Sequence, residues 1–203
     1  WPLALGPSSL PSHVAIIMDG NRRWARLRGL AAVMGHEKAA RDVIEPIVDR
    51  AIALGIKFLT FWAFSTENWK RDKQEIRALM GIFREGLKKL GSRLTEKGVR
   101  LNVVGEMSKF PEDIRKQTEH YMEISRGNRK ITVSFALNYG GRDEILRAVK
   151  KLIAEILEGS KGSTLPVARL NLNKITEETF GKYLDTADMP DPDLIIRTGG
   201  EFR

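Results

Sequence analysis

The residues of this chain that could do chemistry gather first at Asp19–Arg26. The stretch DGNRRWAR places one carboxylate before a Gly-Asn turn, three arginines and a tryptophan. Arginine forks and backbone N–H groups at a helix start bind phosphate oxygens, and Mg²⁺ accepts a single carboxylate when water and phosphate complete its ligands. These residues indicate a site for a metal-bound, multiply charged anion, and diphosphate is the first candidate.

Three further turns carry polar, glycine-rich or arginine-bearing sequences, each directly after an apolar run. They read STENWKR from Ser65, NYGGR from Asn138 and RTGGEFR from Arg197. In open α/β sheets, ligands bind beyond the carboxyl ends of the strands, so we expect these turns to share one edge of a sheet. Arg71, Arg197 and Arg203 would form a second cationic group there, which suggests two diphosphate substrates side by side.

The elements that must position these turns alternate between strands and helices. The expected strands are Val14–Met18, Phe58–Phe64, Arg100–Val104, Ile131–Leu137 and Leu194–Ile196. Apolar stripes at helical spacing lie within residues 43–52, 76–94 and 145–157, and we expect Pro46 to kink the first of these helices or remove one of its hydrogen bonds. This order predicts an α/β fold with a mostly parallel central sheet flanked by helices.

Composition places the chain among ordinary globular proteins. It has 203 residues, 42% hydrophobic and 30% charged, with a formal net charge of +8 and no cysteine. The absence of cysteine excludes disulfides and thiolate metal sites and agrees with a reducing cytosol. No apolar run approaches the roughly 20 residues of a membrane span. We expect a loose arm over residues 1–12, a single domain over residues 13–203 and a flexible surface loop at Gly159–Pro166.

Each singled-out residue also has a structural interpretation. An aspartate before glycine is common in plain turns, and tryptophans more often pack in a core than hold a ligand. Ser65 and Asn68 suit a cap for the helix expected over residues 72–97. His36 could bond a helix start, and His13 and His120 are interpreted as structural. No P-loop, GxGxxG, HExxH or GxSxG motif is present.

Five motifs together resemble one known family. MDGNRRWA, the GH of MGHEKAA, FSTENWKR, NYGGR and IRTGGEFR occur in the order and spacing of the cis-prenyltransferases, and the resemblance runs from about His13 to Arg203. The best-known members are undecaprenyl diphosphate synthases, also called isoprenyl transferases. The resemblance implies condensation of isopentenyl diphosphate with an allylic diphosphate, usually farnesyl or geranyl, to form cis double bonds. It also implies a homodimer, a six-stranded, mainly parallel sheet and a hydrophobic tunnel.

The resemblance also implies roles for individual residues. Asp19 would bind Mg²⁺ and assist departure of the allylic diphosphate, and Asn68 would orient groups during proton removal, with diphosphate or water accepting the proton. Arg197 and Arg203 would clamp isopentenyl diphosphate. The allylic substrate would be held by Gly20, Asn21, Arg22, Arg23, Trp24 and His36, and the neighbouring site would be lined by Ser65, Thr66, Glu67, Trp69 and Arg71.

The chain departs from the family pattern in three places. It stops at Arg203 inside the last motif, so the final strand and a metal-holding glutamate of the family are expected to be missing, as in a C-terminal truncation. Ala32 stands where many members have an arginine that contacts the allylic diphosphate. Ala39 and Asp72 replace a common glycine and a common proline.

Two other functions remain open at this point. The +8 charge and four tryptophans would suit a phosphate- or nucleic-acid-binding module. The arginines lie at strand ends beside an aspartate, however, so we expect no nucleic-acid partner. A catalytically silent partner subunit is the second alternative, against which Asp19, Asn68 and the RTGG sequence argue. We expect a cytoplasmic enzyme that contacts membranes through its lipid product.

Overall fold

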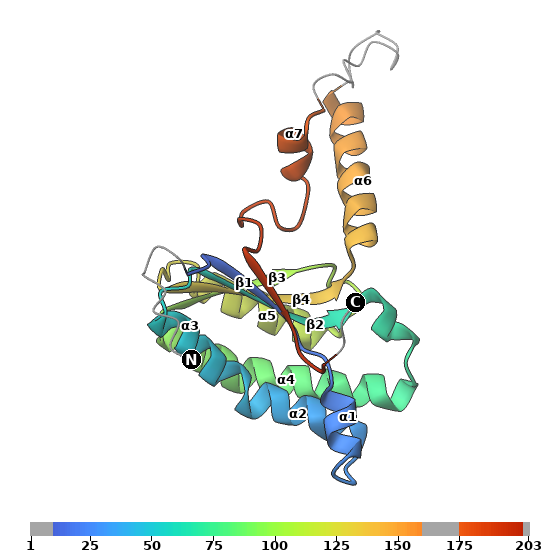
Figure 1. Cartoon of the computed structure of the whole chain (residues 1–203). Helices are drawn as coiled ribbons and strands as arrows, with labels where there is room; N and C mark the ends of the chain where they lie inside the picture. Colours follow the sequence, from blue (N-terminus) through green and yellow to red (C-terminus); the bar gives the residue numbers. More distant parts are fainter. Residues whose placement is uncertain (1–9, 160–174, 201–203) are drawn as a thin grey trace.

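A parallel sheet forms the centre of the molecule, which a computed structural model describes over residues 10–159 and 175–200 (Figure 1). Its five described strands lie in the order β3-β4-β2-β1-β5, and every neighbouring pair is parallel. All five expected strands are confirmed, with ends shifted by at most two residues. They are β1 His13–Ile17, β2 Phe58–Ser65, β3 Val99–Val104, β4 Ile131–Tyr139 and β5 Leu194–Arg197.

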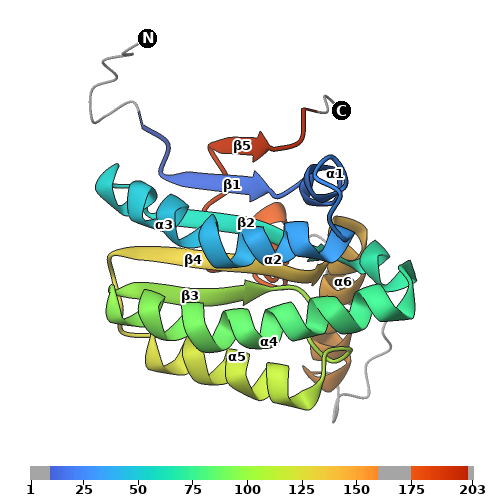
Figure 2. The same ribbon diagram turned by 90° about the horizontal axis from the view of Figure 1, so that it is seen from below.

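Helices α2 to α5 cover one face of the sheet, whereas α6 rises away from the other face with α7 beside it (Figures 1 and 2). The helices connect successive strands, as parallel pairing requires. Their bounds are α1 Asn21–Arg26, α2 Ala32–Asp42, α3 Ile44–Ala53, the 3-10 helix η2 Thr66–Lys70, α4 Lys73–Glu96, α5 Glu112–Ile124, α6 Gly141–Gly159 and α7 Glu177–Gly181.

The core lies between the sheet and α3, α4 and α5. Phe61 and Val133 of the sheet are completely buried together with Val48 of α3 and Leu94 of α4. A second cluster surrounds Phe64 at the end of β2.

Two local expectations need correction. Pro46 does not kink a helix over residues 43–52, because α2 ends at Asp42 and α3 begins at Ile44, which places the proline in the first turn where an N–H is not needed. Asn68 does not cap the long helix. It caps η2 together with Ser65, and α4 is capped by Asp72, whose Oδ1 accepts a hydrogen bond from the Gln74 N–H at 2.7 Å.

The third apolar stripe is helical but does not join the core. Four of its side chains are exposed in α6, among them Leu146 at 61% exposure. All four residues of β5 are exposed as well. The spacing of the apolar residues therefore predicted the helix correctly, but it did not predict whether another element packs against the apolar side chains. Most of the arm expected over residues 1–12 and of the loop at Gly159–Pro166 lies outside the described residues, as does Arg203.

Candidate active site

Asp19 lies directly beyond β1 and is held by two neighbours. Its Oδ1 accepts a hydrogen bond from the Gly20 N–H at 2.7 Å, and its Oδ2 accepts from Arg197 Nη2 at 2.7 Å and Nε at 3.1 Å. The Arg197 guanidinium first, and then the Gly20 N–H, hold the pKa of Asp19 below its ordinary value. The carboxylate is therefore ionised at neutral pH.

The ends of β1 and β5 meet because the two strands pair in parallel, with Ile17 opposite Arg197. Thr198 Oγ1 then accepts from the Asp19 N–H at 2.9 Å and donates to the Asp19 carbonyl at 2.7 Å. Gly20 and Gly199 both have positive φ, and a Cβ on Gly20 would lie 3.0 Å from the Gly199 Cα. Glycine at both positions lets the two turns pack backbone against backbone.

Arg22 at the start of α1 and Arg71 directly after η2 line the same cavity as Asp19 and share one carboxylate. Arg71 Nη1 lies 3.1 Å from Glu75 Oε1, and Arg22 Nη2 lies 3.6 Å from the other oxygen of the same carboxylate. Glu75 thus joins two arginines that sequence reasoning assigned to the site, although it was itself missed. The signal that could have found it is its i,i+4 spacing from Arg71 in the first turn of α4.

Two buried nitrogen atoms at this site have no hydrogen-bond partner among the described residues: His36 Nε2 and Arg22 Nε. Burial of the imidazole, and then the Arg71 guanidinium, lower the pKa of His36, so the ring is neutral at pH 7. Buried polar atoms are almost always satisfied, so these two call for a water molecule or a ligand. Glycine at position 35 lets α2, which carries His36, pack closely against α1, because a Cβ there would collide with the Asn21 carbonyl oxygen at 2.0 Å.

These groups surround a polar cavity of about 420 Å³. Four arginines and one imidazole line it against a single carboxylate, which favours a ligand with several negative charges. Its lining residues are Met18, Asp19, Gly20, Asn21, Arg22, Arg23, Arg26, His36 and Arg71. Seven predicted site residues, from four different elements or turns, are therefore brought together.

An apolar cavity of about 470 Å³ adjoins the polar one, and Asp19 and His36 line both. It extends between the sheet and α4, where the stripe expected over residues 76–94 contributes its wall. From the helix expected over residues 43–52, only Ile44 takes part. Ser65, Glu67, Asn68 and Arg197 stand at its polar end. The wall residues from α4 are Leu79, Ile82, Phe83, Gly86, Leu87, Leu90, Gly91 and Leu94.

Both tryptophans assigned to the site lie outside these two cavities. Trp69 packs its ring 4.9 Å from that of Phe64, and its Nε1 donates to Asn138 Oδ1 at 2.8 Å. Trp24 lies under the guanidinium of Arg28, which is 4.5 Å from the ring centre. Thr66 also lines neither cavity. It packs against Gly140 instead, where an added Cβ would lie 2.7 Å from the Thr66 hydroxyl oxygen.

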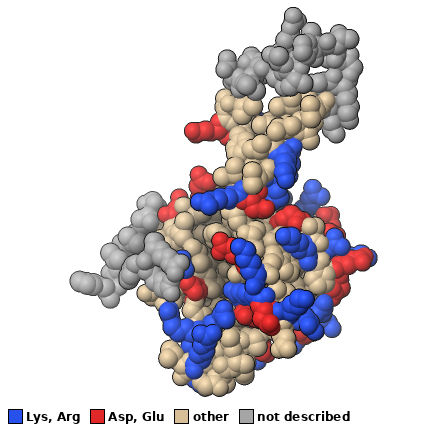
Figure 3. Space-filling view, turned by 90° about the vertical axis from the view of Figure 1, so that its right-hand side faces the viewer, with Lys and Arg blue, Asp and Glu red and all other residues tan. Residues whose placement is uncertain are grey.

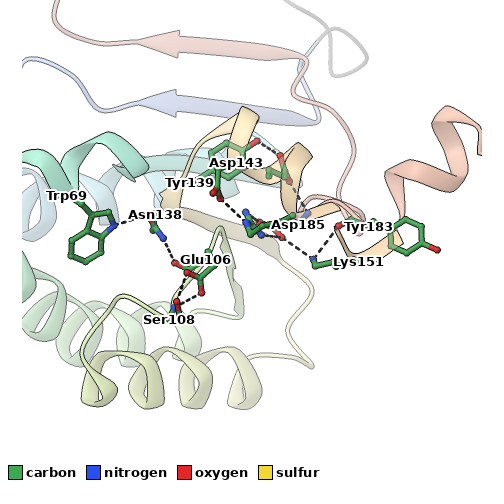
Figure 4. Close-up of polar contacts among 11 residues, drawn as sticks. Trp69, Glu106, Ser108, Asn138, Tyr139, Asp143, Lys151, Tyr183 and Asp185 are labelled. Carbon is green, nitrogen blue, oxygen red and sulfur yellow. Dashed lines mark hydrogen bonds and ion pairs between the residues drawn. The ribbon is translucent and has the colours of Figure 1, made fainter. Parts of the chain in front are cut away.

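The NYGGR turn builds an internal network rather than a cavity wall (Figure 4). Asn138 Nδ2 donates to the Glu106 carbonyl at 2.7 Å, and the Tyr139 hydroxyl donates to Glu144 Oε2 at 2.7 Å. The other Glu144 oxygen accepts from the Asp185 N–H at 2.9 Å. Burial and this carboxylate raise the pKa of Tyr139. The network joins β4 and α6 to the segment that leads to β5 and hence to Arg197.

The site suits Mg²⁺ only as part of a complex with an anion. Among residues 10–159 and 175–200, no three His, Asp or Glu side chains cluster as ligands. Asp19 offers one ionised carboxylate beside a cationic cavity, a donor set in which phosphate oxygens and water would supply the remaining ligands. The chemistry of this donor set therefore fits Mg²⁺, with Asp19 as its protein ligand.

Comparisons with known proteins place this site in a family. Residues 17–203 match the family model described as putative undecaprenyl diphosphate synthase. An isoprenyl transferase of Clostridium perfringens is 44% identical over 99% of this chain and 76% of that protein. A tritrans,polycis-undecaprenyl-diphosphate synthase (geranylgeranyl-diphosphate specific) of Pyrococcus furiosus is also 44% identical, over 96% of this chain and 70% of that protein.

Solved structures agree with the sequence comparisons. Lavandulyl diphosphate synthase from Lavandula x intermedia, in complex with dimethylallyl diphosphate, superposes with a TM-score of 0.86 at 34% identity, covering 95% of this chain and 79% of that one. A probable undecaprenyl diphosphate synthase from Campylobacter jejuni gives 0.69 at 28% identity, covering 95% and 77%. With the parallel sheet and the motifs at its edge, these matches show that the chain belongs to the undecaprenyl diphosphate synthase family of cis-prenyltransferases.

Proposed function

We propose that the protein condenses isopentenyl diphosphate with an allylic diphosphate of the farnesyl or geranyl type, in a Mg²⁺-dependent reaction that makes a cis-polyprenyl diphosphate. The observation that carries this proposal is the junction of the two cavities. A cationic chamber opens at Asp19 and His36 into an apolar one between the sheet and α4. This pairing suits a substrate with a charged diphosphate head and a hydrocarbon tail.

Ionisation of the allylic diphosphate leaves negative charge on the departing group and positive charge on carbon. Arg22, Arg23 and Arg71 stabilise the departing diphosphate, and the unpartnered His36 Nε2 and Arg22 Nε are available to its oxygens. The backbone N–H group of Asn21, at the start of α1, adds a further donor. The walls of the apolar cavity exclude water that would otherwise react with the allylic cation.

The second substrate occupies the polar end of the apolar cavity. Ser65, Glu67 and Asn68 line this end, and Arg197 reaches it from β5. The Asn68 Oδ1 accepts from the Ser65 N–H at 3.0 Å, which fixes the amide and leaves its Nδ2 to orient isopentenyl diphosphate. Because an amide is a poor base, the proton lost on bond formation passes to diphosphate or water. Arg203 would complete the clamp with Arg197.

When bound, Mg²⁺ supplies charge neutralisation to the diphosphate, with Asp19 as its protein ligand. Asp19 is shared in this structure with Arg197, at 2.7 Å. The Asp19 carboxylate therefore lies between the proposed allylic and isopentenyl subsites. In a reaction that joins two diphosphates, this is the place where the negative charge of the substrates needs to be balanced.

The exposed apolar surfaces suggest how the protein assembles. β5 and the stripe on α6 expose several large aliphatic side chains on the face opposite α2 to α5. We propose that a second copy of the chain covers this face in a homodimer. No helix within residues 10–159 and 175–200 is long and apolar enough to cross a bilayer. We further propose a cytoplasmic location, where both water-soluble substrates would be available.

The arrangement of arginines argues against nucleic acid as the natural partner. Arg22 and Arg71 point into a cavity and share Glu75, rather than forming an exposed stripe interleaved with free aromatic rings. A diphosphate fits such a cavity, whereas a polynucleotide backbone does not.

Incubation with radiolabelled isopentenyl diphosphate tests the proposal. Farnesyl, geranyl and geranylgeranyl diphosphates are supplied separately with Mg²⁺, and the extracted lipid is sized. We expect label in a long polyprenyl product with at least one primer, and its loss when EDTA replaces Mg²⁺. No incorporation with any primer by protein that circular dichroism shows to be folded would contradict the proposal.

A further inference from the structure

The connection between α1 and α2 forms an exposed corner that is both cationic and apolar. Residues 20–36 contain four arginines and no aspartate or glutamate. Leu27, which follows α1 directly, has 78% of its surface exposed, and Met34 on α2 is 42% exposed. Leu27 is the most exposed of the large hydrophobic residues in the described chain.

The two arginines that flank Leu27 have no carboxylate partner among the described residues, whereas Arg22 is paired with Glu75. Neither Arg26 nor Arg28 forms a salt bridge within the described residues, and both are exposed. The Arg28 guanidinium lies 4.5 Å from the Trp24 ring centre, and its Nη1 donates to the Trp24 carbonyl at 3.4 Å. These two contacts hold the Arg28 charge at the surface beside Leu27 and restrict the motion of the side chain.

Space-filling representation shows the same combination (Figure 3). Blue basic side chains, with a few red acidic ones between them, lie above a tan tip at the foot of the molecule, at the level of the α1–α2 connection in Figure 1. The apolar face of α6 at the other end has no excess of positive charge, because the helix balances four basic residues with four acidic ones. These are Arg142, Arg147, Lys150 and Lys151 against Asp143, Glu144, Glu155 and Glu158. Charge thus distinguishes the two exposed apolar regions.

We propose that the corner formed by Arg26–Met34 docks on an anionic lipid bilayer. Arg26 and Arg28 attract the headgroups, and Leu27 enters the interface, as in other surface-bound segments that combine basic and apolar residues. Arg26 also lines the polar cavity, so docking holds the mouth of that cavity beside the membrane surface. The inference goes beyond the proposed reaction, because bilayer binding does not depend on prenyl transfer.

The side chains at this corner favour lipid over nucleic acid. Proteins that bind single strands stack bases on exposed aromatic rings. Trp24 is the aromatic residue of this segment, and Arg28 covers one of its faces. The exposed apolar groups are instead the aliphatic Leu27 and the thioether Met34, which suit acyl chains.

Vesicle sedimentation tests the proposal with two double variants of equal charge change. Leu27→Glu with Arg28→Glu alters the corner, and Ile124→Glu with Arg126→Glu alters another exposed site at the end of α5, where Ile124 is 50% exposed. We expect the wild type to bind phosphatidylcholine vesicles containing 30% phosphatidylglycerol at least tenfold more tightly than pure phosphatidylcholine. The corner variant should lose at least tenfold in binding, and the control variant less than twofold.

A fluorescence measurement keeps the test independent of those charge reversals. Leu27→Trp should shift its emission to the blue when phosphatidylglycerol vesicles are added, and Ile124→Trp should not. The proposal is overturned by equal vesicle binding of the wild type and the corner variant, by an unshifted Leu27→Trp spectrum, or by tighter binding to a single-stranded oligonucleotide than to vesicles. Vesicle binding without prenyl transfer would instead contradict only the proposed reaction.

Discussion

Two strand ends of this sheet carry the same kinds of residue, and the fold uses them differently. At the end of β1, an aspartate, a glycine and arginines line a cavity, where His36 Nε2 and Arg22 Nε have no hydrogen-bond partner in the part of the chain that the structure describes. At the end of β4, the NYGGR turn pairs its polar groups internally, through Glu106, Glu144 and Asp185 (Figure 4). In sequence, both are polar, glycine-bearing turns after buried strands.

The difference lies in whether the protein itself completes the hydrogen bonds. A polar group that already has its partners gains little from a ligand, whereas a buried group without one gains a full hydrogen bond when a ligand arrives. The rim at β1 and β5 is therefore suited to binding, and the network at β4 and α6 to holding that rim in place. Substitutions in the two regions should separate activity from stability.

Asp19→Ala should produce the largest change in activity. Loss of the carboxylate removes the proposed Mg²⁺ ligand, and we expect turnover to fall by about a thousandfold or more, which corresponds to about 4 kcal/mol in the activation free energy. The free energy of unfolding should change by about 1 kcal/mol or less, because Asp19 is not part of the core. Steady-state kinetics and urea unfolding measure the two quantities. A near-normal turnover would remove Asp19 as the metal ligand.

Glu144→Gln should show the opposite pattern. Glu144 is only 5% exposed and accepts from both the Tyr139 hydroxyl and the Asp185 N–H. An amide cannot accept with both of its heavy atoms, so we expect a loss of about 2 kcal/mol in the free energy of unfolding. Asp143→Asn, at a more exposed carboxylate of the same helix turn, is the matched control and should cost less than about 1 kcal/mol. Equal losses of unfolding free energy for both variants would show that the buried network around Glu144 stabilises the fold no more than an exposed ion pair does.

Arg197→Ala should separate the two substrates. Because Arg197 reaches the polar end of the apolar cavity from β5, we expect the Michaelis constant for isopentenyl diphosphate to rise by about tenfold, the loss of one charge-assisted contact. The constant for the allylic diphosphate should change less. If only the allylic constant rises, the two subsites have been assigned in the wrong order.

His36 should give the smallest effect, a change in how stability depends on pH. Its pKa is lowered from the ordinary 6.5, so in acid the unfolded chain binds a proton that the folded chain does not. Stability therefore falls as the pH drops below about 6.5, by at most about 1.4 kcal/mol per pH unit for this group. Urea unfolding at pH 7.5 and 5.5 should show a smaller acid loss for His36→Gln than for the wild type. Identical losses would mean that His36 is not buried as a neutral ring.

Strand positions were predictable because short apolar runs bounded by turn residues leave few alternatives in a parallel sheet. Parallel pairing then places Asp19 near Arg197, which explains why these two could be associated from sequence. The direction in which individual side chains point, and the partners they reach, could not be predicted. Trp69 turns into the aromatic cluster around Phe64, and Glu75 joins Arg22 to Arg71.

Exposure was the other property that the sequence did not predict. The stripe within residues 145–157 has the spacing of a core helix, yet Leu146 and its neighbours on α6 are exposed. Periodicity depends on the helix alone, whereas burial depends on what packs against it. The same limit applies to the NYGGR turn, whose internal network continues through Glu144 to Asp185, 41 positions further along the chain.

A crystal structure of this protein with Mg²⁺ and inorganic pyrophosphate would test the central claim most directly. The claim is that the unsatisfied polar groups at the β1 rim, rather than the satisfied ones at β4, bind diphosphate. We expect pyrophosphate oxygens within hydrogen-bonding distance of His36 Nε2 and Arg22 Nε, with the ion on Asp19. An empty cavity at saturating pyrophosphate, or pyrophosphate bound elsewhere while Asp19 remains paired only with Arg197, would contradict the account.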